Sequence, residues 1–274
     1  MAHKKTKRLD TITNQKLSIQ ISLSGLSFCI LNTASQTITA FETIAFDKKV
    51  NPYEALERLI HYFEIRDYLH TTFDDIMVIH ENDLSTLVPK ALFNEDYLAD
   101  YLKFNSKILK SDYLSFDALT HTDSVAVYVP YVNINNYIYD AFGAFTFKHY
   151  STILIDAIFL AEKDKNATKV YVHVDAHHFE IIALEKGKLA LYNTFEYNNA
   201  DDFIYYVLFT LEQLGYEPET INVDLIGNIA LHDNLYNIAY KYIRHISISK
   251  LASTIAIPQD PDTKQSNYII THSF

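Results

Sequence analysis

We predict the fold from one segment near the start of the chain, residues 16–46, which reads KLSIQISLSGLSFCILNTASQTITAFETIAF. Ser24-Gly25 and the polar residues 32–36 divide it into three short apolar runs. The runs are residues 17–23, 26–31 and 37–46. Short runs rich in Ile, Leu, Thr and Phe, separated by turn residues, are typical of β-strands. The chain is therefore expected to begin with three antiparallel strands.

The same pattern returns halfway along the chain, in KVYVHVDAHHFEIIALEKGKLALYNTFEY, residues 169–197. Its apolar runs are residues 170–176, 179–184 and 189–197. The third runs also share lettering, because FETIAF at 41–46 lies 151 positions before YNTFEY at 192–197. Both read aromatic, any, Thr, apolar, any, aromatic. Self-similarity at a fixed distance predicts an internal duplication.

A helix and a fourth strand are expected after each triplet. Asn51-Pro52 begins the first helix, and Asn199 or Asp201 caps the second, which ends at Gly215. The fourth strands are expected at residues 76–80 and 221–226. The order β-β-β-α-β thus occurs twice.

Further elements complete the first half of the chain. We expect helices around residues 96–104, 135–142 and 151–163, and strands at 124–131 and 145–150. The polar run at 163–166 marks a domain boundary. The organisation predicted is a flexible basic tail at 1–10, an N-terminal lobe at 11–165 and a C-terminal lobe at 166–274.

Composition narrows the class of protein. The chain has 274 residues, 49% of them hydrophobic, and a formal net charge of −11. A nucleic-acid-binding protein needs a basic face, so nucleic acid is not an expected partner. No apolar run approaches the roughly 20 residues of a membrane span. With one cysteine, Cys29, a disulfide framework is excluded, and a cytoplasmic setting is expected.

The duplicated β-β-β-α-β unit resembles the actin-like ATPase superfamily, which includes actin, sugar kinases, the Hsp70 ATPase domain and bacterial cell-division and pilus-assembly proteins. The fold class implied is α/β, a duplicated actin-like (ribonuclease H-like) fold with two lobes. More narrowly, LSTLVPKALF at 84–93 and the region of Asp175 resemble an uncharacterised bacterial domain-of-unknown-function family with this fold.

The resemblance implies a phosphate loop after the first strand of each half, in which Asp orients magnesium and Gly admits phosphate. In the first half the position of the Asp falls on Ser22 or Ser24, and Gly25 is the loop glycine that remains. One carboxylate expected at an ATP site is therefore replaced by serine.

In the second half Asp175 is present, but Ala176, His177 and His178 stand where glycine is expected. The resemblance places Asp175 at the interlobe cleft. The superfamily's adenosine-binding turn is similar to the segment around Gly227, which precedes an expected helix at 231–244. An ordinary strand-to-helix turn explains Gly227 equally simply.

The histidines allow a separate interpretation as a metal site. His173, Asp175 and His177 alternate along one expected strand and would share a face. Two imidazoles and a carboxylate could begin a zinc or iron site, to which His80 could approach across the cleft. The simpler interpretation is a polar strand face lining the cleft.

Nucleophilic catalysis is not indicated. Residues 22–25, SLSG, lack the first glycine of a Gly-x-Ser-x-Gly elbow. Cys29 lies within an apolar run and is expected to be a small core residue rather than a reactive thiolate.

Three hypotheses follow. The first is a non-catalytic scaffold that binds a protein partner, with no cofactor and no useful rate of ATP hydrolysis. The second is an ATPase or phosphotransferase that binds ATP and magnesium through unusual phosphate loops. Its contacts would be Ser22, Ser24, Gly25, Asp175 and Gly227. The third is a metal-dependent enzyme.

Overall fold

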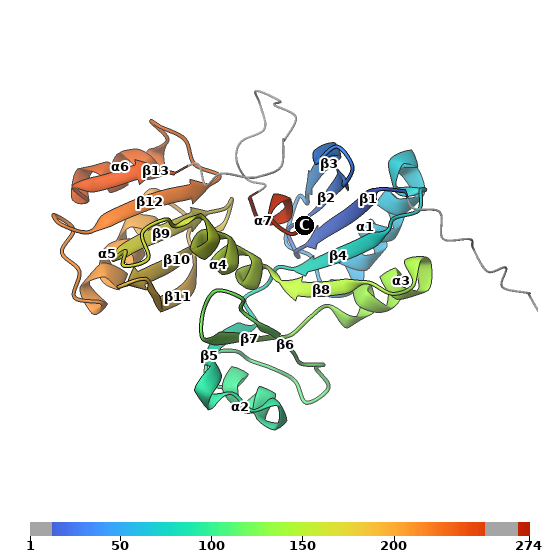
Figure 1. The fold of residues 1–274 in the computed structure, drawn as a ribbon, viewed down its shortest axis with the longest axis horizontal. Helices are drawn as coiled ribbons and strands as arrows, with labels where there is room; N and C mark the ends of the chain where they lie inside the picture. The colour runs from blue at the N-terminus through green and yellow to red at the C-terminus, as the bar shows by residue number, and fades with distance from the viewer. Residues whose placement is uncertain (1–12, 250–267) are drawn as a thin grey trace, which may run out of the picture.

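The computed structural model describes residues 13–249 and 268–274 and has two lobes, each centred on a five-stranded sheet (Figure 1). The N-terminal sheet has the order β3 (Thr37–Ala45), β2 (Gly25–Asn32), β1 (Gln15–Ile21), β4 (Asp75–His80) and β8 (Thr146–His149). The C-terminal sheet has the order β11 (Lys188–Glu196), β10 (His178–Glu185), β9 (Lys169–Val174), β12 (Asn222–Gly227) and β13 (His245–Ile248).

Each sheet is mixed in the same way. The first three strands of each lobe pair antiparallel, and the remaining pairs are parallel. The prediction of two separate mixed sheets is confirmed. The predicted basic tail at residues 1–10 lies outside the described residues.

The two sheets repeat each other in register. Cys29 of β2 pairs with Phe41 of β3, and Ile182 of β10 pairs with Tyr192 of β11. Phe41 and Tyr192 are the first residues of the two stretches with shared lettering. The short sequence match therefore corresponds to equivalent structural positions.

Helices pack against both sheets, and one further helix lies between them. The apolar faces of α1 (Pro52–Ile65) and α3 (Val132–Phe142) pack on one face of the N-terminal sheet, and those of α5 (Ala200–Gln213) and α6 (Asn234–Tyr242) pack on the C-terminal sheet. Helix α4 (Tyr150–Ala161) is buried on nearly all sides, because its apolar residues pack against both sheets. It joins the lobes at the centre of the molecule (Figure 1).

A third, three-stranded sheet was not expected from the sequence. It has the order β5 (Ser85–Pro89), β7 (Ser124–Tyr128) and β6 (Ser115–Ala118), and the short helix α2 (Leu98–Leu102) packs on it. The 3₁₀ turns η2 (Lys90–Leu92) and η3 (Glu95–Tyr97) follow β5. A further 3₁₀ turn, η1 (Asp67–Leu69), follows α1. The strand predicted at 124–131 and the helix predicted around 96–104 correspond to β7 and α2. The other strands of this sheet and the 3₁₀ turns are too short for sequence periodicity to reveal.

The ends of the chain add two elements that the sequence did not predict, β13 and the single-turn helix α7 (Tyr268–Thr271). The predicted helix at 231–244 is shorter, as α6. The predicted boundary at residue 165 lies between α4 and β9 and stays a prediction. Within the described ranges 13–249 and 268–274, no helix is long and apolar enough to cross a membrane.

Candidate functional site

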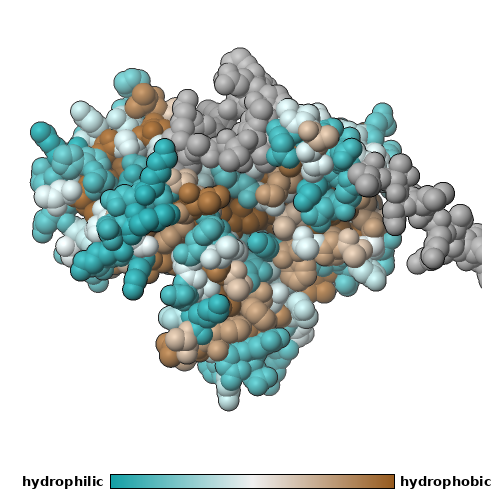
Figure 2. Space-filling view, in the orientation of Figure 1, coloured by the Kyte–Doolittle hydropathy of each residue, from teal (hydrophilic) through white to brown (hydrophobic). Residues whose placement is uncertain are grey.

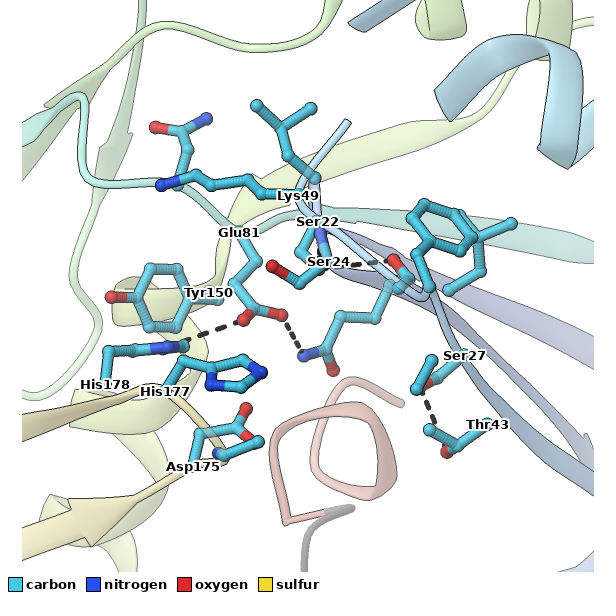
Figure 3. Close-up of a pocket in the computed structure, with 18 of the residues that line it drawn as sticks. Ser22, Ser24, Ser27, Thr43, Lys49, Glu81, Tyr150, Asp175, His177 and His178 are labelled. Atoms are coloured by element: carbon cyan, nitrogen blue, oxygen red, sulfur yellow. Dashed lines mark hydrogen bonds and ion pairs between the residues drawn. The ribbon is translucent and has the colours of Figure 1, made fainter. Parts of the chain in front are cut away.

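A pocket of about 700 Å³ lies between the two lobes. It is lined by the turn between β1 and β2, the turn between β9 and β10, and the residues that follow β4 and β12. Ser22, Ser24, Gly25 and Asp175 all line it. Figure 3 shows Ser22 and Ser24 on one side of the pocket and Asp175 on the other. Gly227 is not among the lining residues, whereas its neighbour Asn228 is.

The two turns have the same backbone hydrogen bonds. The Ser22 N–H donates to the Gly25 carbonyl at 3.0 Å, and the Asp175 N–H donates to the His178 carbonyl at 2.9 Å. Ser22 is thus the counterpart of Asp175, and Gly25 is the counterpart of His178. The cleft location of Asp175 agrees with the sequence prediction, and its contact with a nucleotide stays a prediction.

Further amides of these turns are used within the turns themselves. The Ser24 N–H donates to the Ser22 Oγ at 3.1 Å, and the Ala176 N–H donates to the Asp175 Oδ1 at 2.6 Å. A phosphate loop needs free N–H groups aimed at the ligand. At residues 22, 24, 175 and 176 these groups already have acceptors.

The two glycines have structural reasons to be glycine. A Cβ at Gly25 would lie 2.6 Å from the Ile44 carbonyl oxygen of the neighbouring strand. Gly227 has a φ of +87°, and a Cβ there would lie 2.4 Å from the Val174 carbonyl oxygen. The fold therefore gives a steric reason for both glycines, and for Gly227 it agrees with the interpretation as a strand-end turn. Contact of either residue with a nucleotide stays a prediction.

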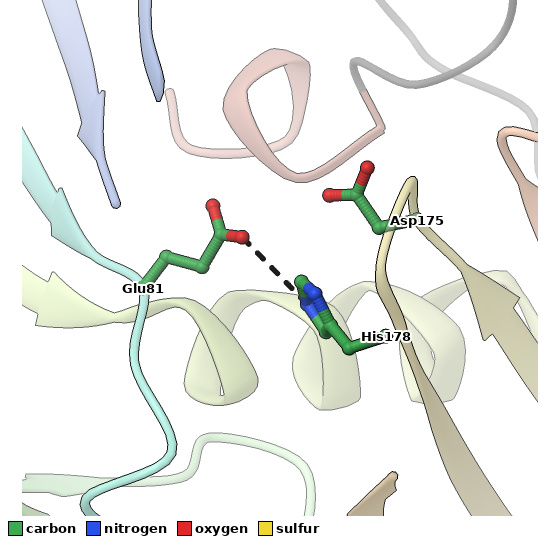
Figure 4. Close-up of side chains that lie close together, drawn as sticks. All are labelled: Glu81, Asp175 and His178. Atoms are coloured by element: carbon green, nitrogen blue, oxygen red, sulfur yellow. Dashed lines mark ion pairs between the residues drawn. The ribbon is translucent and has the colours of Figure 1, made fainter. Parts of the chain in front are cut away.

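Glu81, which sequence reasoning missed, extends from the N-terminal lobe into the pocket. Its N–H donates to the Ile21 carbonyl at 2.9 Å, which continues the β1–β4 pairing. Its carboxylate accepts a hydrogen bond from Gln20 at 2.7 Å and lies 3.6 Å from the His178 Nε2 of the other lobe. Figure 4 shows Glu81 and Asp175 on either side of His178.

Glu180, which sequence reasoning also missed, pairs with His178 of the same strand, β10. It is fully buried within β10, and its carboxylate lies 3.1 Å from the His178 Nε2 and 2.7 Å from the His173 Nδ1. Tyr150 of α4 donates a hydrogen bond to it at 2.9 Å. A glutamate in the middle of the apolar run 179–184 is the sequence signal that could have identified it.

The electrostatics of this cluster favour a protonated His178. Burial alone would lower the pKa of His178, but the carboxylates of Glu180, Glu81 and Asp175 outweigh it and raise the pKa to about 10. Burial alone would raise the pKa of Glu180, but His178 and His173 lower it to about 2. Burial, and then the charge of Asp175, raise the pKa of Glu81. The positive charge of His178 is thus shared among the carboxylates of Glu180, Glu81 and Asp175.

The predicted metal set does not form. Strand β9 ends at Val174, so Asp175 and His177 lie in a turn and His173 is buried against Glu180. The prediction that the three share a strand face is wrong, because the chain reverses at Asp175. Among the described residues, Glu81, Asp175 and His178 bring possible ligand atoms within 4.8 Å of one another. A metal bound there would have to displace the proton that the neighbouring carboxylates favour on His178.

Two other residues considered as functional belong to the core. His80 is fully buried and bonded to the Asn135 side chain at 3.0 Å, and it accepts the Tyr131 N–H at 3.2 Å. Burial lowers its pKa to about 4. The expectation that His80 approaches the cleft is wrong. Cys29 is buried, as predicted, and burial raises its thiol pKa to about 12.

Two β-β-β-α-β lobes around a central cleft define the actin-like ATPase fold, which solved structures share with this chain. The chain belongs to the family described as "Protein of unknown function (DUF3822)", which matches residues 4–246. Among curated protein sequences, none matches the chain.

The solved structures compared are distant in sequence. A Bacteroides thetaiotaomicron protein with actin-like ATPase fold and unknown function superposes with a TM-score of 0.77 at 22% identity, covering 89% of this chain and 94% of that one. A PilM-PilN type IV pilus biogenesis complex gives 0.58 at 9% identity, covering 94% and 97%. The ethanolamine utilization protein EutJ from Carboxydothermus hydrogenoformans gives 0.51 at 8% identity, covering 97% and 90%.

Proposed function

We propose that this chain is a non-catalytic actin-like module that acts by binding a protein partner. The observation that carries the proposal is the state of the two cleft turns. The amides of Ser22, Ser24, Asp175 and Ala176 already have acceptors within the protein. Phosphoryl transfer depends on positioning and on neutralising phosphate charge. Turns in which these four amides are occupied offer fewer donors for either role.

The charge of the cleft supports the same proposal. A phosphate between the turns would face the carboxylates of Glu81 and Asp175, with the His178 cation already paired to Glu180. Negative charges on a phosphate and on nearby carboxylates repel each other strongly in a partly buried site. ATP with magnesium remains the alternative, in which the metal would have to offset this repulsion.

Exposed apolar side chains support a protein partner. In the three-stranded subdomain, Leu92, Tyr97, Phe104, Leu109 and Tyr113 are each more than half exposed. Figure 2 shows hydrophobic surface on this subdomain. Contiguous exposed apolar surface is typical of interaction sites. The PilM-PilN structure shows a protein of this fold in complex with another protein. We place the interaction in a reducing, cytoplasmic setting, supported by the lone buried cysteine.

Nucleotide binding and turnover test the non-catalytic part. We expect no thermal shift with ATP and magnesium, and no phosphate release above the blank from the wild-type chain or from Asp175→Ala. Asp140→Ala, an exposed change on α3, is the matched control. Turnover of about one per second that is lost in Asp175→Ala, but not in Asp140→Ala, would establish an ATPase instead.

Site-specific photocrosslinking tests the partner. A photoreactive phenylalanine analogue at Phe104, which is 80% exposed, should give one discrete protein adduct in cells that express the chain natively. The same analogue at Tyr53 of α1, which is 76% exposed, should give none. Equal yields at both positions would contradict a specific surface on the subdomain.

A further inference from the structure

The last described residues of the chain, 268–274, lie between the two lobes. Figure 1 shows α7 beside the N-terminal sheet, and Figure 4 shows its turn passing close to Glu81 and Asp175. Helix α7 contacts β1, β2 and α4. The preceding described strand, β13, is the far edge of the other lobe's sheet. The chain therefore returns from the C-terminal lobe to the N-terminal one.

This segment is fastened to the N-terminal sheet by apolar burial. Ile269 is 4% exposed and Ile270 is fully buried, in the cluster that also holds Cys29 and Ile79. The Ser273 hydroxyl forms a hydrogen bond with the Ser18 hydroxyl of β1. Within the turn, the Ser273 Oγ also donates to the Ile270 carbonyl at 2.7 Å. Residues 268–274 thus complete the second face of the N-terminal sheet.

The contact with the C-terminal lobe is less complete. The Tyr268 ring lies beside the His173 ring, with centroids 6.4 Å apart. Among residues 13–249 and 268–274, neither the buried Tyr268 hydroxyl nor the buried His173 Nε2 has a hydrogen-bond partner. Buried polar atoms without partners favour states in which water reaches them. Opening this contact would restore hydration to both groups.

Release of α7 would break no pairing in the two five-stranded sheets. Removal of Ile269 and Ile270 would, however, uncover apolar side chains that face both lobes.

We propose that residues 268–274 form a C-terminal latch, which holds the two lobes at one angle while it is docked and lets the cleft widen when it is released. The latch acts through the burial of Ile269 and Ile270 where α7 contacts β1, β2 and α4, and through the Tyr268 ring beside His173 of β9. It differs from the His178–Glu81 contact, which spans the cleft at its polar end. The inference does not depend on what the cleft binds.

Spin labels on the two lobes test the latch. Cysteines replacing exposed Glu57 of α1 and Glu212 of α5 carry the labels, and buried Cys29 is shielded from reaction. We expect one narrow distance distribution in the full chain. Ile270→Ala should broaden it at least two-fold, because the docked segment loses its most buried side chain. Truncation after residue 267 should broaden it further, and a synthetic peptide of residues 268–274 should narrow it again.

The control is Ile138→Ala on α3, equally buried but within the N-terminal lobe alone. It should leave the width of the distribution unchanged. An Ile270→Ala distribution as narrow as that of the full chain overturns the latch. If Ile270→Ala lacks native circular dichroism, hydrogen exchange of the unaltered chain decides. Amides of 268–274 that exchange before those of α4 support the latch, and exchange only with global unfolding overturns it.

Discussion

The two hairpins that face each other across the cleft have the same backbone and different chemistry. Ser27 of β2 and Glu180 of β10 occupy equivalent positions, each opposite a threonine on the neighbouring strand. Ser27 bonds that threonine, Thr43, at 3.1 Å on the protein surface. Glu180 is buried and binds two histidines. Gly25 and His178 are also equivalent, and again only the residue of the C-terminal hairpin carries an ionisable side chain.

This difference shows that the duplicated backbone does not require a symmetric cleft. The hydrogen bonds that close the two turns are the same, so the turn geometry survives without aspartate or glycine at fixed places. The ionised groups are concentrated on the C-terminal hairpin. The N-terminal lobe contributes Glu81 to the same cluster, and Glu81 follows β4 rather than lying in the β1–β2 hairpin.

Neutralising Glu180 is the largest test of this asymmetry. In Glu180→Gln, His178 and His173 lose their buried counter-charge while they stay desolvated. Breaking a buried ion pair by removing one partner costs about 3–5 kcal/mol. We expect the free energy of unfolding, measured by urea denaturation at neutral pH, to fall by about 4 kcal/mol.

The matched change is Glu196→Gln on β11, where the glutamate side chain is 76% exposed and pairs with Lys49. An exposed pair contributes about 1 kcal/mol at most. Similar losses from the two variants would show that the Glu180 cluster is not a buried charge network.

The pH dependence of stability sharpens the comparison next. The pKa of His178 is about 10 in the folded chain, against about 6.5 when unfolded. A raised histidine pKa stabilises fully below about pH 6.5, and this contribution is lost as the pH rises through 10. We expect a loss of several kcal/mol over this window, measured by urea denaturation.

His178→Gln should flatten the curve between those pH values, whereas His245→Gln, at an exposed position of the same lobe, should leave its slope intact. Buried tyrosines such as Tyr128, whose pKa burial raises, affect stability only above about pH 10. An unchanged slope in His178→Gln would mean that the imidazole is not held as a cation.

The glycines give a smaller test. Gly227→Ala places a methyl group 2.4 Å from the Val174 carbonyl oxygen at a positive φ, whereas Gly215→Ala has a positive φ and open space. Both should lose about 1 kcal/mol to the backbone conformation. The overlap should cost Gly227→Ala about 2 kcal/mol more. Equal unfolding free energies would remove the structural explanation for this glycine and return attention to a ligand.

Local sequence signals were enough for the framework of the fold. Alternating apolar runs, turn residues and the capping residues Asn51 and Asn199 act over a few positions, so the two β-β-β-α-β units could be predicted. The location of Asp175 at the cleft was implied by the resemblance to the actin-like superfamily. The three-stranded sheet could not be predicted, because β5 pairs with β7 across an interval that contains other elements and β6 is only four residues long.

The chemistry of the cleft depended on contacts that a single segment does not encode. Glu81 reaches the pocket because β4 pairs with β1, about 60 residues earlier. His173 and Glu180 meet because the chain reverses at Asp175 and brings the two strands into register. Treating residues 170–176 as one uninterrupted strand placed His177 on the wrong side of that reversal.

The helix caps offer the smallest comparison of the two lobes. The Asn51 side chain accepts hydrogen bonds from two N–H groups of α1, at 2.9 and 3.0 Å, and Glu54 bonds back to the Asn51 N–H at 3.1 Å. The Asn199 side chain accepts one, from Asp202 of α5 at 2.9 Å.

Loss of an N-cap costs about 1 kcal/mol. Asn51→Ala should therefore lower the unfolding free energy by about 1.5 kcal/mol and Asn199→Ala by about 1 kcal/mol, measured by thermal denaturation. Because Asp201 and Asp202 still place negative charge in the first turn of α5, the second helix keeps part of its stabilisation after the substitution. A larger loss in Asn199→Ala would mean that the C-terminal helix, not the N-terminal one, depends more on its cap.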